Sequence, residues 1–235
     1  MAVVSIIVPT YNESGNIRAL VDRLEKSLDA AGIGGYEIVV MDDDSPDRTA
    51  DGVNGLKRPN VRAYNRRGQR PGLSASVIDG FALAHGEILG VMDAGLSHPP
   101  EVVPDLIRAV EKEGFLLAIG SRYVPGGGVA DWPFLRRLAS RAACALARFL
   151  TPVRDATSGF FFFRRSILEG VRLNPLGFKI GLEVFVKSRH ENSFKEVAFC
   201  FPDRVAGKSK LKIGVVASFF EQMAILSVDR LKGAR

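Results

Sequence analysis

The chain is poor in cysteine and contains no long apolar run. Its 235 residues include only two cysteines, Cys144 and Cys200, at a spacing typical of neither a metal site nor a disulfide framework. This pattern favours a reducing compartment. No apolar run approaches the roughly 20 residues that cross a bilayer. We expect no signal peptide, because Met1–Ser5 leads straight into a strand-like segment.

Acidic residues are scarce in the second half. Residues 1–120 carry 12 Lys and Arg against 17 Asp and Glu, whereas residues 121–235 carry 20 against 9. A basic half indicates an anionic partner, either a nucleic acid, a phosphate-bearing substrate or a membrane surface, unless it is merely a solvated face. Because the chain has no arginine-rich tail and no zinc or RNA-binding motif, we expect no nucleic acid partner.

Glycine-rich dinucleotide motifs and Walker loops are absent as well. Strand and helix patterns nevertheless alternate through the first half. The expected strands are Val3–Val8, Glu37–Met41, Val61–Tyr64, Ile88–Met92 and Phe115–Ile119, and the expected helices are Ser14–Ala30, Leu73–Ala84 and Pro100–Glu113. Repeated units of this kind predict an α/β fold with a doubly wound, mostly parallel sheet flanked by helices.

The second half has a different character but shows no domain boundary. Its expected elements are a basic helix Trp132–Leu150, an aromatic strand Gly159–Arg164, a helix Gly181–Arg189, a strand Phe194–Phe201 and a final helix Ile213–Leu231. The final helix is too short and too polar to span a membrane. It suits either a membrane interface or packing on the protein's own core.

Polar side chains follow several predicted strands. Asp93 ends an apolar run, Tyr11 and Glu13 follow the first strand, and Asp42 and Asp43 end the second. Ligands of open α/β sheets bind outside the carboxyl ends of the strands. There a carboxylate can hold a divalent cation on a diphosphate, and an aromatic ring can stack on a base. Taken alone, Asp93 could equally be a helix cap or turn residue.

These motifs, in this order, resemble family 2 glycosyltransferases, which have the GT-A fold, and within them the polyprenol-phosphate (dolichol-phosphate) mannose synthases. The resemblance covers roughly residues 3–212. The early motifs, shared by the whole family, are Pro9–Glu13, Asp42–Asp47, Gly72–Ser74 and Met92–Pro100. The later ones, which point to the lipid-phosphate subgroup, are Gly120–Tyr123, Gly126–Val129 with Trp132, Asp155 with Thr157–Phe160, and Asp203-Arg204 with Gly207–Leu211.

The resemblance implies an inverting enzyme that moves mannose from GDP-mannose to a polyprenyl phosphate. It implies one GT-A domain over 1–235, with a nucleotide-sugar-binding half 1–120, an acceptor-binding half 121–212 and a C-terminal helix 213–235. The implied catalytic residues are Asp93, Arg122, Arg136 and Arg204. The implied donor-binding residues are Pro9, Tyr11, Glu13, Asp42, Asp43, Asp93, Ala94, Arg204 and Lys208. The acceptor phosphate would be held by Arg122, Arg136 and Ser140.

The chain departs from the family pattern at Gly95, where relatives carry the second aspartate of Asp-Ala-Asp. The implied Mg²⁺ or Mn²⁺ would then be bound weakly by Asp93, with Asp44 or water as the further ligand. Alternatively, basic residues would take the place of the metal. A catalytically impaired sugar-nucleotide-binding protein is another alternative. UDP-glucose or UDP-N-acetylglucosamine is an alternative donor. We expect a protein at the cytoplasmic face of a membrane that is either peripheral or dependent on a separate anchoring partner.

Overall fold

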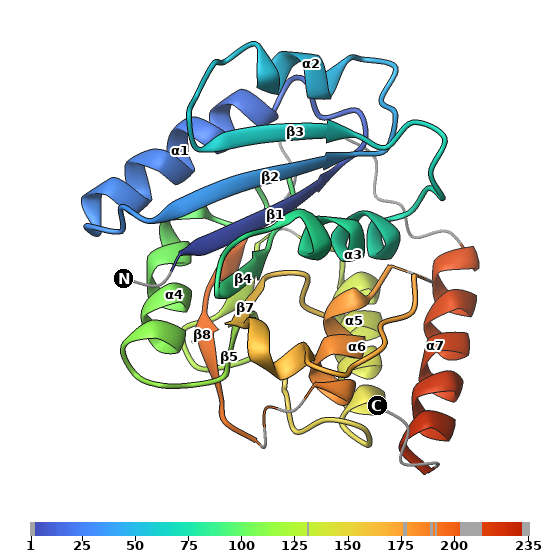
Figure 1. Cartoon of the computed structure of the whole chain (residues 1–235). Coiled ribbons are helices and arrows are strands. Elements are labelled where there is room, and N and C mark those ends of the chain that lie inside the picture. Colours follow the sequence, from blue (N-terminus) through green and yellow to red (C-terminus); the bar gives the residue numbers. More distant parts are fainter. Residues whose placement is uncertain are drawn as a thin grey trace.

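Seven strands form the central sheet of the computed structural model, which describes residues 3–130, 132–175, 178–188, 190, 192–202 and 213–231. The strand order is β3-β2-β1-β4-β7-β5-β8 (Figure 1). The strands are β1 (Val4–Thr10), β2 (Tyr36–Asp42), β3 (Val61–Asn65), β4 (Ile88–Val91), β5 (Leu117–Ser121), β7 (Phe161–Arg164) and β8 (Phe194–Ala198). Only β7 runs antiparallel, paired with β4 on one side and β5 on the other. The predicted mostly parallel sheet is therefore confirmed.

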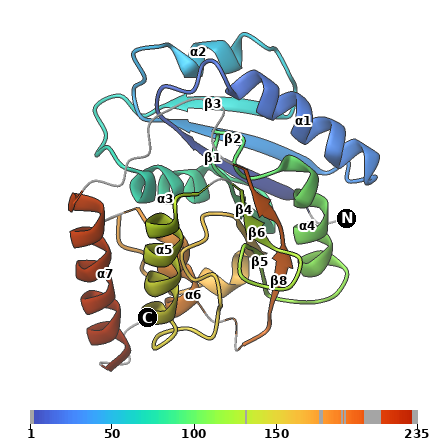
Figure 2. The ribbon, with the colours of Figure 1, turned by 180° about the vertical axis from the view of Figure 1, so that it is seen from behind.

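Helices cover both faces of this sheet. One face packs against α1 (Ile17–Ala30), α2 (Thr49–Asn54) and α4 (Val103–Glu111), which follows a 3-10 turn at Pro100–Val102. The other face packs against α3 (Leu73–Leu83), α6 (Ile180–Lys187) and the 3-10 turn Arg165–Leu168. Two further helices, α5 (Phe134–Ala147) and α7 (Ile213–Leu231), stand beside α6 (Figures 1 and 2).

The alternation of side chains along β1 creates the two cores. Ile6 and Val8 point to the face covered by α1 and α4, whereas Ile7 points to the face covered by α3. The sheet closes tightly around β7, because a Cβ on Gly90 would lie 2.1 Å from the ring of Phe162, its cross-strand partner. Glycine at this position therefore admits the buried aromatic strand.

Most expected elements are present, with shifted ends. The first strand continues through Pro9 to Thr10, and α5 begins at Phe134, two residues later than expected. The expected strand Phe194–Phe201 divides into β8 and β9 (Cys200–Phe201). β9 pairs in parallel with β6 (Gly128–Val129). The glycine-rich segment before Trp132 is thus held by contacts from outside itself.

The C-terminal helix α7 has the bounds expected from the sequence. Met223 and Leu226 pack on Ala147, Ala156 and Leu182, so one side of the helix belongs to a small core of its own. Phe220 and Val228, at 56% and 45% exposure, face away from that core. Over the described ranges, no helix is both long and apolar enough to cross a membrane.

Candidate active site

The predicted site residues gather at the carboxyl edge of the sheet. Tyr11 follows β1, Asp43 follows β2, Asp93 lies two residues beyond β4, and Arg122 follows β5. These four strands run in the same direction, because β7 is antiparallel to both β4 and β5. The topology therefore brings residues from both halves of the sequence to one edge, where ligands of open α/β sheets bind.

Two side chains lock the turns after β1 and β2 together. The backbone N–H of Asn12 donates to Ser45 Oγ (2.9 Å), and that of Glu13 donates to Thr49 Oγ1 (3.1 Å). Asp42 lies beneath these turns and is fully buried; it accepts hydrogen bonds from Thr10 Oγ1 (2.9 Å) and from Ser45. Asp42 thus fixes the ends of β1 and β2 relative to each other.

Above this base, Tyr11 is 51% exposed at the end of β1, while Pro9 and Glu13 are partly buried. An exposed ring beside a rigid turn is suited to stacking on a base.

The carboxylate of Asp43 connects the turn after β2 to the start of α3. It accepts from the backbone N–H of Gly72 (2.8 Å) and from Ser76 Oγ (2.8 Å), and it pairs with Arg66. Arg66 in turn donates to Asp79 on α3 (2.7 Å). The motif Gly72–Ser74 is therefore attached through Gly72 to the turn after the second strand.

Asp93 is held by its neighbour His98. The backbone N–H of Asp93 donates to His98 Nδ1 (3.0 Å), which leaves the proton of a neutral imidazole on Nε2, 3.8 Å from Asp93 Oδ2. Burial lowers the pKa of His98, although the Asp93 carboxylate acts in the opposite direction, and the ring stacks on Phe160. His98 therefore orients Asp93, whose side chain remains 31% exposed.

The space around Gly95 fits a weak cation site. A Cβ at residue 95 would meet no atom closer than Glu13 Oε1, at 4.0 Å, while Ala94 is buried. Within the described ranges, no three His, Cys, Asp or Glu side chains gather in a metal-binding cluster. Since Mg²⁺ commonly takes one or two carboxylates and completes its shell with phosphates and water, Asp93 suits an ion that arrives with a diphosphate.

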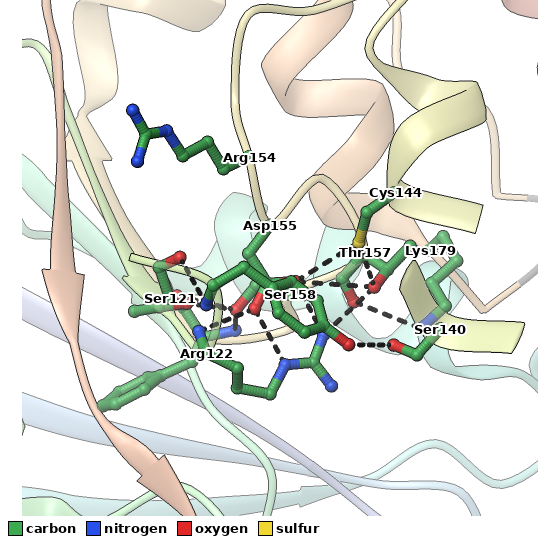
Figure 3. A network of polar contacts seen from close by, with 12 residues as sticks. Ser121, Arg122, Ser140, Cys144, Arg154, Asp155, Thr157, Ser158 and Lys179 are labelled. Atoms are coloured by element: carbon green, nitrogen blue, oxygen red, sulfur yellow. Dashed lines mark hydrogen bonds and ion pairs between the residues drawn. The ribbon is translucent and has the colours of Figure 1, made fainter. Parts of the chain in front are cut away.

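Arg122 anchors a buried polar network at the end of β5 (Figure 3). Its guanidinium binds Asp155 through two hydrogen bonds, Nε to Oδ2 (2.8 Å) and Nη2 to Oδ1 (2.6 Å), and donates to Thr157 Oγ1 (3.0 Å). Burial alone would lower the pKa of Arg122, but the bonds to Asp155 raise it. Arg122 is therefore a permanently charged group in a fixed orientation.

Arg136 and Ser140 of α5 lie next to this network. Both arginines lie over the ring of Trp132, with Arg136 Cζ 3.8 Å and Arg122 Cζ 5.4 Å from its centroid. Ser140 Oγ accepts a hydrogen bond from the hydroxyl of Tyr123 (2.7 Å), the residue after Arg122. Arg122, Arg136 and Ser140 are thus brought together from two elements. Trp132 is an internal platform, in edge-to-face contact with Phe201.

Two predicted cations, Arg204 and Lys208, lie outside the described residues. Glu183 of α6 pairs with Lys187 (2.9 Å) and accepts from the backbone N–H of Asn174 (2.8 Å), so it holds α6 and the preceding loop together. The two cysteines form no disulfide with each other; Cys144 is buried beside Thr157, and Cys200 is exposed.

One basic residue of the network was missed by the sequence reasoning. Lys179, just before α6, donates from Nζ to the backbone oxygen of Thr157 (3.1 Å). The only signal in the sequence is a lysine directly before an apolar helix, a position where the helix dipole disfavours a positive charge.

Comparisons with known proteins agree with this arrangement. The family model described as glycosyl transferase family 2 matches residues 5–172. The dolichol-phosphate mannosyltransferase of Pyrococcus furiosus is 47% identical over 213 residues, which are 89% of the chain but 59% of that relative. The Saccharomyces cerevisiae protein of the same name is 38% identical over 234 residues, covering 95% of the chain and 86% of that relative.

A solved structure supports the fold. Glucosyl-3-phosphoglycerate synthase from Mycobacterium tuberculosis, crystallised with Mn²⁺, UDP and glucosyl-3-phosphoglycerate, has a TM-score of 0.69 and 21% sequence identity. The match covers 100% of this chain and 81% of that one. The predicted GT-A fold is therefore confirmed.

Proposed function

Because the chain belongs to glycosyl transferase family 2, we propose that it transfers mannose from GDP-mannose to a polyprenyl phosphate, with inversion at the anomeric carbon. The observation that carries the proposal is the meeting of Arg122, Arg136 and Ser140 beside the strand ends that present Tyr11 and Asp93. The names of the mannosyltransferase relatives support the same substrates. The activity is proposed here for a chain that spans 59% of the Pyrococcus relative.

The donor would lie over the ends of β1, β2 and β4. The exposed ring of Tyr11 would stack on the base, while Pro9, Glu13, Asp43 and Ala94 would border the nucleotide. The buried Asp42 would act through the turn that it holds, because its exposed fraction is zero. Arg204 and Lys208 would complete the diphosphate site.

The acceptor phosphate would lie against Arg122, Arg136 and Ser140. A lipid phosphate is already an anion near neutral pH, so the reaction needs no dedicated general base. The site must instead hold two anionic groups in line and stabilise the negative charge that develops on the leaving diphosphate. Arg122 suits this work because Asp155 fixes its orientation before substrate binds.

A divalent cation would be held by Asp93 and the donor diphosphate. When bound, it supplies positive charge to the leaving diphosphate. The M. tuberculosis neighbour with Mn²⁺ supports a divalent cation of this kind. His98 keeps Asp93 oriented for this contact.

The lipid acceptor requires contact with a membrane surface. Large apolar side chains are exposed on α5 and α7 and just after α5, namely Phe134, Leu135, Leu138, Phe149 and Phe220. Exposed apolar groups beside basic residues suit the interface of a bilayer. We propose that the protein is peripheral at the cytoplasmic face of a membrane, attached either directly or through an anchoring partner.

A second candidate follows from Gly95. Without the second aspartate, the chain would bind a sugar nucleotide but transfer its sugar slowly. The loss of one comparable electrostatic contact raises the activation free energy by about 3 kcal/mol, which lowers the rate roughly a hundredfold. The intact cluster around Arg122 favours the active enzyme, because a binding protein has no need of an acceptor site.

A donor comparison tests the proposal. The protein is incubated with a short polyprenyl phosphate in detergent and with labelled GDP-mannose, UDP-glucose or UDP-N-acetylglucosamine. We expect labelled lipid from GDP-mannose. Because the reaction inverts the anomeric carbon, the mannose that is α-linked in the donor should be β-linked in the lipid product, as measured by NMR. If labelled lipid forms only from a uridine donor, the proposed donor GDP-mannose is wrong. Saturable GDP-mannose binding without any lipid product would favour the catalytically impaired homologue.

A further inference from the structure

Lys179 enters the network around Arg122 from a separate element. Its Nζ donates to the backbone oxygen of Thr157 (3.1 Å), and Arg122 donates to the side-chain Oγ1 of the same threonine (3.0 Å). A single residue therefore anchors both basic side chains. Figure 3 shows Lys179 on the side of the network where Ser140 lies, which is the expected position of the acceptor phosphate.

The Asp155 carboxylate next to this pair is already bonded to Arg122. Both oxygens of Asp155 bind Arg122, and Oδ2 also accepts the backbone N–H of Arg122 (2.9 Å). Among the described residues, Lys179 forms no ion pair; the bond to Thr157 uses one of its amino hydrogens. Lys179 remains partly accessible to solvent. The arrangement thus offers unused donors from two basic groups to an anion.

The position of Lys179 is electrostatically unfavourable for a positive charge. Lys179 occupies the N-cap position of α6 without capping it through its side chain, and the helix dipole disfavours positive charge there. Burial, with the nearby Arg122, lowers the pKa of Lys179, and Asp93 and Asp155 act in the opposite direction. Groups that cost folding energy in this way are common at functional sites.

Lys179 is bonded to a loop that also approaches the expected donor site. Asp93, at the donor site, approaches the loop that carries Thr157, because a Cβ at Gly159 would lie 3.7 Å from Asp93 Oδ1. Both Asp93 and Arg122 are close enough to influence the charge of Lys179. The amino group of Lys179 is thus a candidate donor to a phosphate that binds beside Arg122 and Thr157.

We propose that Lys179 is a phosphate-binding residue of the active site, donating from Nζ to a substrate phosphate oxygen in the space that Arg122 borders. The proposal rests on the proposed function for the identity of the substrate. The same chemistry serves the acceptor phosphate and the donor diphosphate. In the transfer, an acceptor oxygen forms the new bond to the anomeric carbon, and the electron pair of the broken bond leaves with the diphosphate. Lys179 would reduce the repulsion between these two anions and exchanges no proton.

The test compares Lys179→Met with Lys179→Arg, and uses Lys195→Met as the control at an exposed lysine paired with Glu113. Calorimetry measures the binding of GDP and of farnesyl phosphate. We expect Lys179→Met to weaken at least one of them about tenfold, the effect of one charge-assisted hydrogen bond. Weaker farnesyl phosphate binding assigns the acceptor, and weaker GDP binding assigns the donor diphosphate. Lys179→Arg should recover much of the lost affinity. The melting temperature of Lys179→Met should equal that of the wild-type protein.

Wild-type affinity of Lys179→Met for both probes would overturn the proposal. A lower melting temperature that Lys179→Arg restores without restoring binding would also overturn it, since that result describes a structural lysine. Should the wild-type protein bind neither probe, the same comparison with inorganic pyrophosphate decides. Failure of the proposed function has a different signature: the wild-type protein binds the probes and transfers no mannose, while Lys179→Met still binds them more weakly.

Discussion

At the scale of single residues, Asp93 and Gly95 are the central positions of the proposed cation site. His98 fixes Asp93 through a backbone hydrogen bond and a ring nitrogen that faces the carboxylate. Gly95 supplies no ligand, but it does not have a positive φ and no atom crowds the position of its missing Cβ. An aspartate at residue 95 would thus meet neither backbone strain nor a steric clash.

Gly95→Asp should tighten the binding of Mn²⁺ in the presence of GDP. A second carboxylate adds a charged ligand beside Asp93, and we expect about tenfold higher affinity, equivalent to about 1.4 kcal/mol. Electron paramagnetic resonance of free Mn²⁺ measures the change, and Gly95→Ala is the control for the added Cβ. Equal affinity in Gly95→Asp and the wild-type protein would show that residue 95 is not a ligand position.

The sequence identified these residues better than their partners. Asp93 stood out from the pattern because it ends an apolar run, whereas Arg122 was implied by the family resemblance. The contacts of Arg122 with Asp155 and of Lys179 with Thr157 join segments more than 20 residues apart. No spacing in the sequence predicts such pairs, because they form only when the tertiary fold brings the two segments together.

At the scale of elements, α7 is attached by both apolar and polar contacts. Leu226 is buried in the small core with Leu182, and Lys187 of α6 pairs with Asp229 (3.0 Å). Gln222 also donates to the backbone oxygen of Lys179 (3.0 Å). The helix therefore supports the start of α6, next to the network around Arg122.

Leu226→Ala should loosen this attachment. Removing a fully buried leucine side chain costs about 3 kcal/mol, so we expect a lower free energy of unfolding and faster hydrogen exchange along α7. Val228→Ala, at a residue that is 45% exposed, is the matched control and should change stability by less than about 0.5 kcal/mol. Equal effects of the two substitutions would mean that α7 is not docked as described.

A buried carboxylate joins β1, β2 and the end of α3. Glu37 accepts hydrogen bonds from Ser5 Oγ (2.6 Å) and the backbone N–H of His85 (2.6 Å), and it pairs with Arg62. Burial alone would raise its pKa, but these hydrogen bonds lower it from 4.5 to about 2. The resulting stabilisation is complete above about pH 4.5 and is lost as the pH falls toward 2.

Glu37→Gln should therefore destabilise the protein at neutral pH and much less in acid. From the pKa shift we expect a loss of about 3 kcal/mol at pH 7, which shrinks as the pH approaches 2. Urea unfolding at several pH values measures it. Glu113→Gln, at a pair exposed to solvent, should cost less than about 1 kcal/mol at any pH. A loss in Glu37→Gln that does not depend on pH would contradict the assigned pKa.

The elements themselves were predicted unevenly, for physical reasons. The helix α1 carries a strong apolar period. The helix α7 is instead a long, largely apolar segment, and it was predicted with its bounds. The short elements β6, β9 and α2 have two to six residues, too few for a period to appear. The pairing of β6 with β9 joins residues about 70 positions apart, which only the tertiary fold determines.

For the whole molecule, the sheet explains how an acidic half and a basic half form one site. The antiparallel β7 lies between β4 and β5, so the strand that ends near Asp93 and the strand that ends at Arg122 are two positions apart in the sheet. The alternating pattern predicted the parallel units, but nothing local to Phe161–Arg164 indicated its direction. The net positive charge of residues 121–235 suits a half that receives an anionic acceptor.

The most direct measurement is the transfer of labelled mannose from GDP-mannose to a short polyprenyl phosphate in detergent, with Mg²⁺, with Mn²⁺ and with EDTA. We expect a mannosyl phospholipid to form with either metal and its yield to fall when EDTA is added. The absence of this lipid in every condition, from protein that binds GDP-mannose saturably, would contradict the proposed mannosyl transfer.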